Sequence, residues 1–424
     1  MDTPGLIALY YLLCIIAKGG NQLVKKKVRN AIIVLIFGNF LVCIGMSLIF
    51  PVMPFIKNEL HLSATDMGIM NSLFALAQLI ASPIVGQISD KIGRKPILVY
   101  GLLLYMVSEV LFALTNWLWM FDISRTIGGL SAAMVVPTTN ALAADLTTPR
   151  QRARVIGLLS AAFSGGLILG PGIGGILAKF DYKTPFWFAA ILGFLSMLSL
   201  LFMLPSEKEI QKIASRNDVP PVLTERKRSK ASWEQTKKLF SGPMGLLFIL
   251  ILISSFGLVG FESIYSLYVN EVYKFTMENI ALVLTLNGLT SLTFQALLFD
   301  RLVVWLTEKR LIRYCFFLSF AGTIWIMLAH SKLEVIIATL IVFTAYDLIR
   351  PAITTLLTKA SATAQGLING VNMSLTSVGN IIGPIMSGAL LDMNYHYPYI
   401  VVTVFLVASW LMTYKVKQKF TVSL

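Results

Sequence analysis

The chain has 424 residues, of which 56% are hydrophobic and 13% charged, and its formal net charge is +14. Soluble proteins contain about 25% charged residues, so this composition excludes a large soluble enzyme and a disordered chain. The Lys and Arg residues lie mainly between long apolar runs, which favours a membrane protein with basic loops over a nucleic-acid-binding protein.

The first 23 residues contain a short apolar run, 6–17, that is only about 18 Å long as a helix and too short to span a bilayer. It lacks the basic start and the small-residue cleavage site of a signal peptide. Two interpretations remain open: an interfacial helix, or a start site assigned too far upstream, with initiation near Leu23 or Val24. We expect residues 1–30 to form a cytoplasmic or interfacial extension.

Long apolar segments follow in close succession. A helix needs about 20 apolar residues to cross the hydrocarbon core, and only helices pair the whole backbone within one continuous segment. The sequence therefore predicts an all-α membrane protein with 12 transmembrane helices, at 31–55, 67–88, 97–115, 117–143, 155–177, 185–204, 244–269, 276–299, 311–329, 333–358, 366–390 and 397–414.

The basic residues predict the orientation of these spans. If the chain starts inside, 27 Lys and Arg residues fall in inner segments and only 5 in outer segments. Cytoplasmic loops carry such an excess. We therefore expect both termini to be cytoplasmic.

One long polar segment divides the chain into six spans plus six, and the two halves share landmarks. Pro137 and Pro171 in the first half correspond to Pro351 and Pro384 in the second, at offsets of 34 and 33 residues. Repeated bundles around a central site are typical of secondary transporters. The predicted units are an N-terminal six-helix bundle, a cytoplasmic linker, a pseudo-symmetric C-terminal six-helix bundle and a cytoplasmic tail, at 31–204, 205–243, 244–414 and 415–424.

Several motifs resemble one known family. The loop Gly86–Lys95 (GQISDKIGRK), Arg125 in RTIGG and the GLILGPGIGG segment Gly166–Gly175 resemble the motifs of the major facilitator superfamily, specifically its 12-helix drug/proton antiporters. Residues 256–268 and 346–354 resemble quinolone and multidrug efflux pumps in that family. The resemblance covers about residues 30–415 and implies a multi-pass protein of the bacterial plasma membrane.

Charged residues within predicted spans are candidate functional residues, because a charge at mid-membrane costs at least about 2.5–3.5 kcal/mol. The resemblance implies that Glu262 and Asp347 couple transport to protons, together with Arg350 and a cavity-facing Arg125. Three alternatives remain open: a permanent Asp347–Arg350 ion pair, a permanent Arg125–Asp122 ion pair, and a packing role for Glu109 within the N-terminal bundle. The first two pairs are spaced i,i+3, which places both members on one helix face.

An aromatic cavity with one or two acids binds flat lipophilic cations through stacking and cation–π contacts. The candidate substrate-binding residues are Phe74, Gln78, Glu262, Tyr265 and Tyr268. For each aromatic residue, helix packing is the alternative interpretation.

Candidate gating residues lie in two motifs. Gly86, Asp90, Gly93, Arg94 and Lys95 form the predicted inner latch, although Arg94 and Lys95 also fit simple anchoring at the inner surface. Gly166, Gly170 and Gly174 recur every four residues and form one small-residue stripe, beside Pro171 and Gly175. We expect this stripe to form the contact between the two bundles.

The predicted function is proton-coupled multidrug efflux of lipophilic or cationic compounds, such as fluoroquinolones and dyes, by alternating access. We expect no enzyme activity, no cofactor, no metal and no nucleic-acid partner. The chain has no P-loop motif, so it brings no P-loop ATPase of its own, and we expect the proton gradient to drive transport. We also expect a functional monomer. The alternatives are a proton-coupled exporter of one endogenous metabolite, such as a sugar or peptide, and a membrane receptor that transports nothing.

Overall fold

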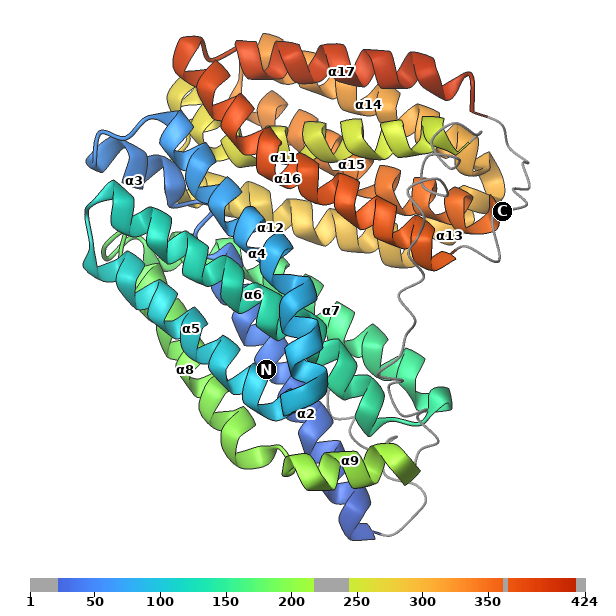
Figure 1. Ribbon diagram of the computed structural model, residues 1–424. Coiled ribbons are helices and arrows are strands. Elements are labelled where there is room, and N and C mark those ends of the chain that lie inside the picture. Colours follow the sequence, from blue (N-terminus) through green and yellow to red (C-terminus); the bar gives the residue numbers. More distant parts are fainter. Residues whose placement is uncertain (1–21, 217–243, 361–364, 417–424) are drawn as a thin grey trace, which may run out of the picture.

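The computed structural model describes residues 22–216, 244–360 and 365–416. These residues form helices and their connecting turns, and none of them lies in a strand (Figure 1). The N-terminal run 6–17 and most of the predicted linker lie outside the described ranges. The all-α prediction is confirmed.

Six long helices and two short ones make up the N half, which we define as residues 22–216. The long helices are α2 (Gln22–Ser47), α4 (Ala64–Ile92), α5 (Arg94–Leu114), α6 (Leu118–Leu146), α7 (Pro149–Leu177) and α8 (Thr184–Met203). The short helices are α3 (Met53–Glu59) and α9 (Glu207–Arg216).

The C half, residues 244–416, repeats this arrangement with one interruption. Its helices are α11 (Gly245–Tyr273), α12 (Met277–Thr293), α13 (Phe299–Leu306), α14 (Glu308–Leu328), α15 (Lys332–Ala360), α16 (Gln365–Met393) and α17 (Tyr397–Thr413). A π-helix, η1 (Phe294–Leu298), joins α12 to α13, so residues 277–306 form one continuous helical run.

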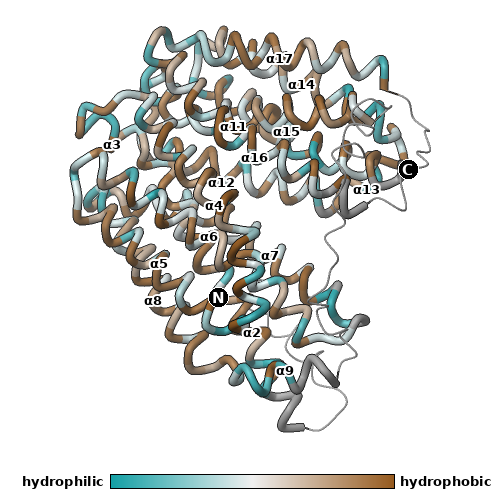
Figure 2. Tube along the Cα trace, in the orientation of Figure 1, coloured by the Kyte–Doolittle hydropathy of each residue, from teal (hydrophilic) through white to brown (hydrophobic). Residues whose placement is uncertain are grey.

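Nine of the described helices are long and apolar enough to cross a membrane, and α17 is a shorter apolar helix. Figure 2 shows apolar residues along most of the helices and hydrophilic residues along α9. Large apolar side chains such as Ile80, Ile92 and Phe202 are more than half exposed, as expected on a surface that faces lipid.

One predicted span contains a break in the helix. The span predicted at 31–55 is helical only to Ser47 and is followed by turns and by α3. Pro51 and Pro54 explain the break, because proline lacks the backbone N–H that a helix interior needs. This break places Phe50 in a turn, where it can face the interior of the molecule.

Most packing occurs within each half. In the N half α4 and α5 pack against α6, and α2 packs against α7 and α8; in the C half α11 packs against α16, and α14 against α15 and α17. The halves pack together mainly through two helix pairs, α4–α16 and α7–α12, and α11 also contacts α3 and α4. The exact bounds of the predicted bundles, 31–204 and 244–414, stay a prediction.

The halves are joined at the end predicted to face outside. The Asp392 carboxylate at the end of α16 accepts hydrogen bonds from the N–H groups of Ala64 and Thr65 at the start of α4, at 2.7 and 2.8 Å, and from the Thr65 hydroxyl at 2.6 Å. Lys57 pairs with Glu271 at 3.2 Å in the same region.

The inner ends of the halves diverge (Figure 1). A Cβ atom added at Gly86, Gly157 or Gly370, near the inner ends of α4, α7 and α16, would meet no atom within 4 Å outside its own helix. The hydrogen bonds and ion pairs identified between described residues of the two halves lie at the outer end or in the outer part of α4. The conformation is therefore closed at the predicted outer face.

Candidate functional site

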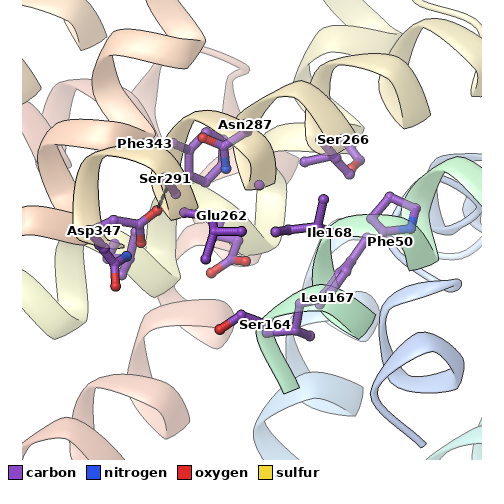
Figure 3. Close-up of a pocket in the computed structure, with 16 residues that line it drawn as sticks. Phe50, Ser164, Leu167, Ile168, Glu262, Ser266, Asn287, Ser291, Phe343 and Asp347 are labelled. Atoms are coloured by element: carbon purple, nitrogen blue, oxygen red, sulfur yellow. Dashed lines mark hydrogen bonds between the residues drawn. The ribbon is translucent and has the colours of Figure 1, made fainter. Parts of the chain in front are cut away.

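A cavity of about 230 Å³ lies between the two halves, beneath the outer closure (Figure 3). The N half contributes α7 and Phe50, and the C half contributes α11, α12 and α15. Cavities between domains or helical bundles are common locations for small-molecule sites. The location matches the central site expected between the predicted repeats.

Two carboxylates face this cavity, and no basic residue is among the 16 residues that line it. Glu262 comes from the middle of α11, and its side chain is exposed to the cavity. Asp347 comes from α15 and is partly buried. Two negative groups between apolar walls produce an electrostatic field that favours cations.

The two acids differ in their hydrogen bonding. The Ser291 hydroxyl of α12 donates a hydrogen bond to Asp347 Oδ2 (Figure 3). Glu262 forms no hydrogen bond or ion pair with any other described residue. Glu262 is therefore the freer group for a cation that enters the cavity.

The proposed permanent ion pair of Asp347 with Arg350 is absent from the described residues. Arg350 is exposed, whereas the Asp347 carboxylate is turned toward the cavity and Ser291. The sequence spacing allowed the pair, but Asp347 is bonded to Ser291 and Arg350 is exposed. Asp347 is thus available to the cavity.

A polar stripe on α12 and η1 was not among the predicted site residues. Asn287, Ser291 and Gln295 all line the cavity, and their spacing of four residues places them on one helix face. This period was visible in the sequence as three polar residues within an apolar span. The π-helix at 294–298 was not visible; such turns occur frequently at functional sites.

Three aromatic residues predicted to bind substrate do not line this cavity. Tyr265 and Tyr268 are fully buried within the C half, where Tyr265 packs against Phe343 and Tyr268 against Tyr399. Phe74 packs in the N half against α6, with its ring 3.4 Å from a Cβ added at Gly128. In this conformation these aromatic residues pack within the halves, as in the alternative interpretation, and their role in substrate binding stays a prediction.

Gln78 likewise lies on α4, and the cavity described above does not include it. Of the five predicted substrate-binding residues, only Glu262 lines this cavity. Sequence spacing placed the others on helices near the centre but could not tell which face of each helix points inward.

Arg125 was predicted to face the cavity. It lies inside the N half instead and does not line the cavity. Its Nη2 atom lies 3.5 Å from Glu109 Oε1, and its guanidinium lies 4.6 Å from the centre of the Phe112 ring. Both charged groups are buried, so each compensates the other. Glu109 is the partner of Arg125, and the alternative pair with Asp122 is not formed among the described residues.

The glycine stripe of α7 also differs from its prediction. Cβ atoms added at Gly166, Gly170 and Gly174 would meet α2 of the same half or the turn after it, not the C half. The prediction that this stripe joins the halves is wrong. The opposite face makes that contact: a Cβ at Gly175 would meet Ala281 of α12, and one at Gly172 would lie 3.0 Å from the Thr285 hydroxyl.

The residues of the Gly86–Lys95 motif form bonds within the N half. Arg94 pairs with Asp90 at 2.6 Å and with Asp145 at 3.1 Å, and the Lys95 ammonium donates to the Leu204 carbonyl at 2.8 Å. Gly93 has a φ of +111°, which explains the need for glycine there. A latch across the halves is not formed in this conformation, and the gating role of these residues stays a prediction.

Among the described residues no group of three or more His, Cys, Asp or Glu side chains is placed to hold a metal ion. The cavity itself presents two carboxylates, the amides of Asn287 and Gln295, and hydroxyls. This set can attract a cation and exchange a proton, and it contains no assembled nucleophile and base.

Two similar halves of long apolar helices around a charged cavity define a secondary transporter. Residues 35–384 match the family model of the Major Facilitator Superfamily, and the chain belongs to that family. It is therefore a transporter and not an enzyme.

Two relatives show how far the similarity extends. The chain is 40% identical over 380 residues to "Multidrug resistance protein 1" of Bacillus subtilis, which covers 89% of this chain and 94% of that protein. It is 35% identical over 370 residues to "Quinolone resistance protein NorA" of Staphylococcus aureus, which covers 87% of this chain and 92% of that protein.

Solved structures with low sequence identity share the fold. The nucleoside transporter NupG superposes with a TM-score of 0.74 at 12% identity, over 91% of this chain and 98% of that one. A bacterial homolog of the human lysosomal transporter Spinster, in an inward-facing and occupied conformation, superposes with a TM-score of 0.71 at 16% identity, over 92% and 96% of the two chains. The major facilitator fold is thus confirmed.

Proposed function

We propose that the protein exports lipophilic and cationic compounds, including fluoroquinolones and dyes, across the bacterial plasma membrane in exchange for protons. The observation that carries this proposal is the cavity between the halves, where Glu262 and Asp347 are the charged members among the 16 described residues that line it. The names of the relatives, multidrug and quinolone resistance proteins, support the same substrate class.

The chemistry of exchange follows from the two acids. An ionised Glu262 or Asp347 attracts a cationic compound, and a proton on the same carboxylate removes that attraction. Protons and cargo therefore compete for one site, which is the linkage that an antiporter requires. No cofactor takes part, and the driving force is the proton gradient plus about 2.3 kcal/mol per charge per 100 mV of membrane potential.

The conformation suits the loading step of this cycle. The outer end is closed by Asp392 and the Lys57–Glu271 pair, and the inner ends diverge. Cargo enters from the cytoplasmic side, and the halves then rock so that the outer end opens. We propose that this occurs in a monomer whose two bundles span 31–204 and 244–414 and whose termini are cytoplasmic.

The remaining motif residues receive supporting roles in this proposal. Arg350 lies near the inner end of α15 and Arg125 pairs with Glu109, so each would affect proton coupling through other groups. Gly86, Asp90 and Lys95 would close the inner face once the outer end has opened.

The test uses the purified full chain in proteoliposomes with an imposed pH gradient. Wild-type protein should transport several unrelated dyes and should release protons when substrate is added. Glu262→Gln and Asp347→Asn should each lower pH-driven transport by at least about tenfold, because each removes a cavity charge.

Asp300→Asn is the matched control, since Asp300 is an exposed acid on α13 outside the cavity. Full transport by both cavity variants would refute the coupling role. Export of a single compound would support a metabolite exporter, and the absence of any transport would support a receptor.

A further inference from the structure

We propose that Asn287 is a specificity-determining residue, whose amide binds a hydrogen-bonding group on the cargo in addition to the cation attraction of Glu262 and Asp347. The inference rests on the proposed transport function. It concerns a residue on α12 that belongs to none of the sequence motifs described above.

Asn287 belongs to the polar stripe on α12 and η1 that lines the cavity. It lies one helical turn before Ser291 and two turns before Gln295, and all three residues line the cavity. Asn287, Phe343, Glu262 and Asp347 all line this cavity (Figure 3). A cation held in the cavity by Glu262 or Asp347 would therefore share that cavity with the Asn287 amide.

Two members of this stripe, Ser291 and Asn287, differ in their hydrogen bonding. The Ser291 hydroxyl is occupied, because it donates to Asp347. The Asn287 Oδ1 atom is buried and has no hydrogen-bond partner within the described part of the chain. Leaving a buried polar atom unpaired costs free energy, so such an atom in a binding cavity requires an explanation.

The Asn287 amide can bind more than one kind of polar group. An asparagine side chain carries two donors and one acceptor and can match an amine, a hydroxyl or a carbonyl group. It has no charge, so it adds nothing to the long-range attraction of a cation. Glu262 and Asp347 would then set how strongly any cation is held, whereas Asn287 would distinguish cations with polar edges from purely apolar ones.

Two permanent cations separate these contributions. Ethidium carries two aromatic amino groups that donate hydrogen bonds, and tetraphenylphosphonium carries no hydrogen-bonding group. Both keep their charge at any pH, so Glu262 and Asp347 act on them alike. The experiment measures KM and maximal rate for export of each cation from proteoliposomes that contain the full chain.

Asn287→Leu keeps a similar side-chain volume and removes the amide. We expect the KM for ethidium to rise about tenfold, which is the size of one lost hydrogen bond at a desolvated site, and the KM for tetraphenylphosphonium to stay within about twofold. Asn287→Ser should restore part of the ethidium affinity, since a hydroxyl also donates and accepts. If the leucine variant does not fold, Asn287→Ala carries the same test.

Thr293→Val is the matched control on the same helix. The Thr293 side chain is exposed and its hydroxyl donates to the Leu289 carbonyl of its own helix, so both cations should be unaffected. Equal loss for both cations in Asn287→Leu, or no change for ethidium, would overturn the inference. If wild-type protein transported neither cation, the proposed function itself would fail, which is a distinct result.

Discussion

Glu262 and Asp347 line one cavity, but their different hydrogen bonding suits them to different roles. Asp347 is held by Ser291, whereas Glu262 extends into the cavity with no partner among the described residues. A group with a fixed hydrogen bond keeps its orientation, and a free group can adapt to cargo of varied shape. We therefore expect cargo-dependent effects to be larger for Glu262→Gln than for Asp347→Asn.

A second residue-scale feature is the backbone of Thr307, between α13 and α14. Its φ of +66° and ψ of +153° fall in a region that is essentially restricted to glycine. Gly93 has a similar conformation, φ +111° and ψ +164°, between α4 and α5 at the corresponding place in the N half. The N half has glycine at this position and the C half does not.

Thr307→Gly should stabilise the protein by about 1 kcal/mol, because relief of about 1–3 kcal/mol of strain exceeds the entropy cost of glycine. The measurement is the melting temperature of the purified protein in detergent. Thr148→Gly is the control: Thr148 precedes α7 with an ordinary φ of −67°, so glycine there should not raise the melting temperature. Equal stabilisation by both variants would contradict the strain argument.

At the scale of elements, α7 packs two different partners with its two faces. Gly166, Gly170 and Gly174 face α2, whereas Gly172 and Gly175 face α12 across the halves. The first face belongs to the stable fold of the N half, and the second belongs to a contact that must separate during rocking. The same helix therefore offers a direct comparison of folding and gating.

Gly170→Leu should lower yield and thermal stability, because a bulky side chain would collide with Ser47 and with the Ile44 carbonyl 2.8 Å away from a Cβ. Overpacking costs about 1–3 kcal/mol or more. Gly175→Leu should fold normally and lower transport, because it obstructs Ala281 only when the outer end is closed. Melting curves and dye export check the pair, and a folded Gly170→Leu with lost transport would contradict the assignment.

The sequence predicted the helices well and the helix faces poorly. Long apolar runs, proline positions and the basic-residue bias specify spans and the all-α class, because lipid permits few other arrangements. The rotation of each helix depends on packing with helices distant in sequence. For that reason the glycine stripe, Tyr265 and Arg125 were each predicted on the wrong partner or face, whereas the location of Glu262 in the cavity agreed with expectation.

At the scale of the whole molecule, one carboxylate at a helix start makes several of the bonds in the outer closure. Asp392 of the C half accepts three hydrogen bonds from Ala64 and Thr65 of the N half, where the α4 dipole also favours a negative charge. Within α4 the N-terminus is also capped by Ser63 and Asp66 of the same half. Of these bonds at the start of α4, those to Asp392 break when the halves separate, and those to Ser63 and Asp66 do not.

Asp392→Ala should shift the conformational equilibrium toward the outward-open state by about tenfold or more, since hydrogen bonds to charged groups are worth about 1.5–3 kcal/mol each. Distances between spin labels at positions 59 and 395, both exposed at the outer end, report the shift. Asp66→Ala is the control, because it removes a cap without releasing the halves. A distance distribution unchanged by Asp392→Ala would show that the closure does not depend on this carboxylate.

The unequal walls of the cavity bear on how resistance can evolve. The acids and amides belong to the C half, whereas the N half contributes Phe50, Leu167, Ile168 and Pro171, with Ser164 as its one polar member in the described cavity. A substitution in that apolar wall can reshape the range of drugs removed while leaving energy coupling intact. Mutants selected on a new antibiotic should therefore accumulate changes in α7 and at Phe50 before they alter the acidic wall.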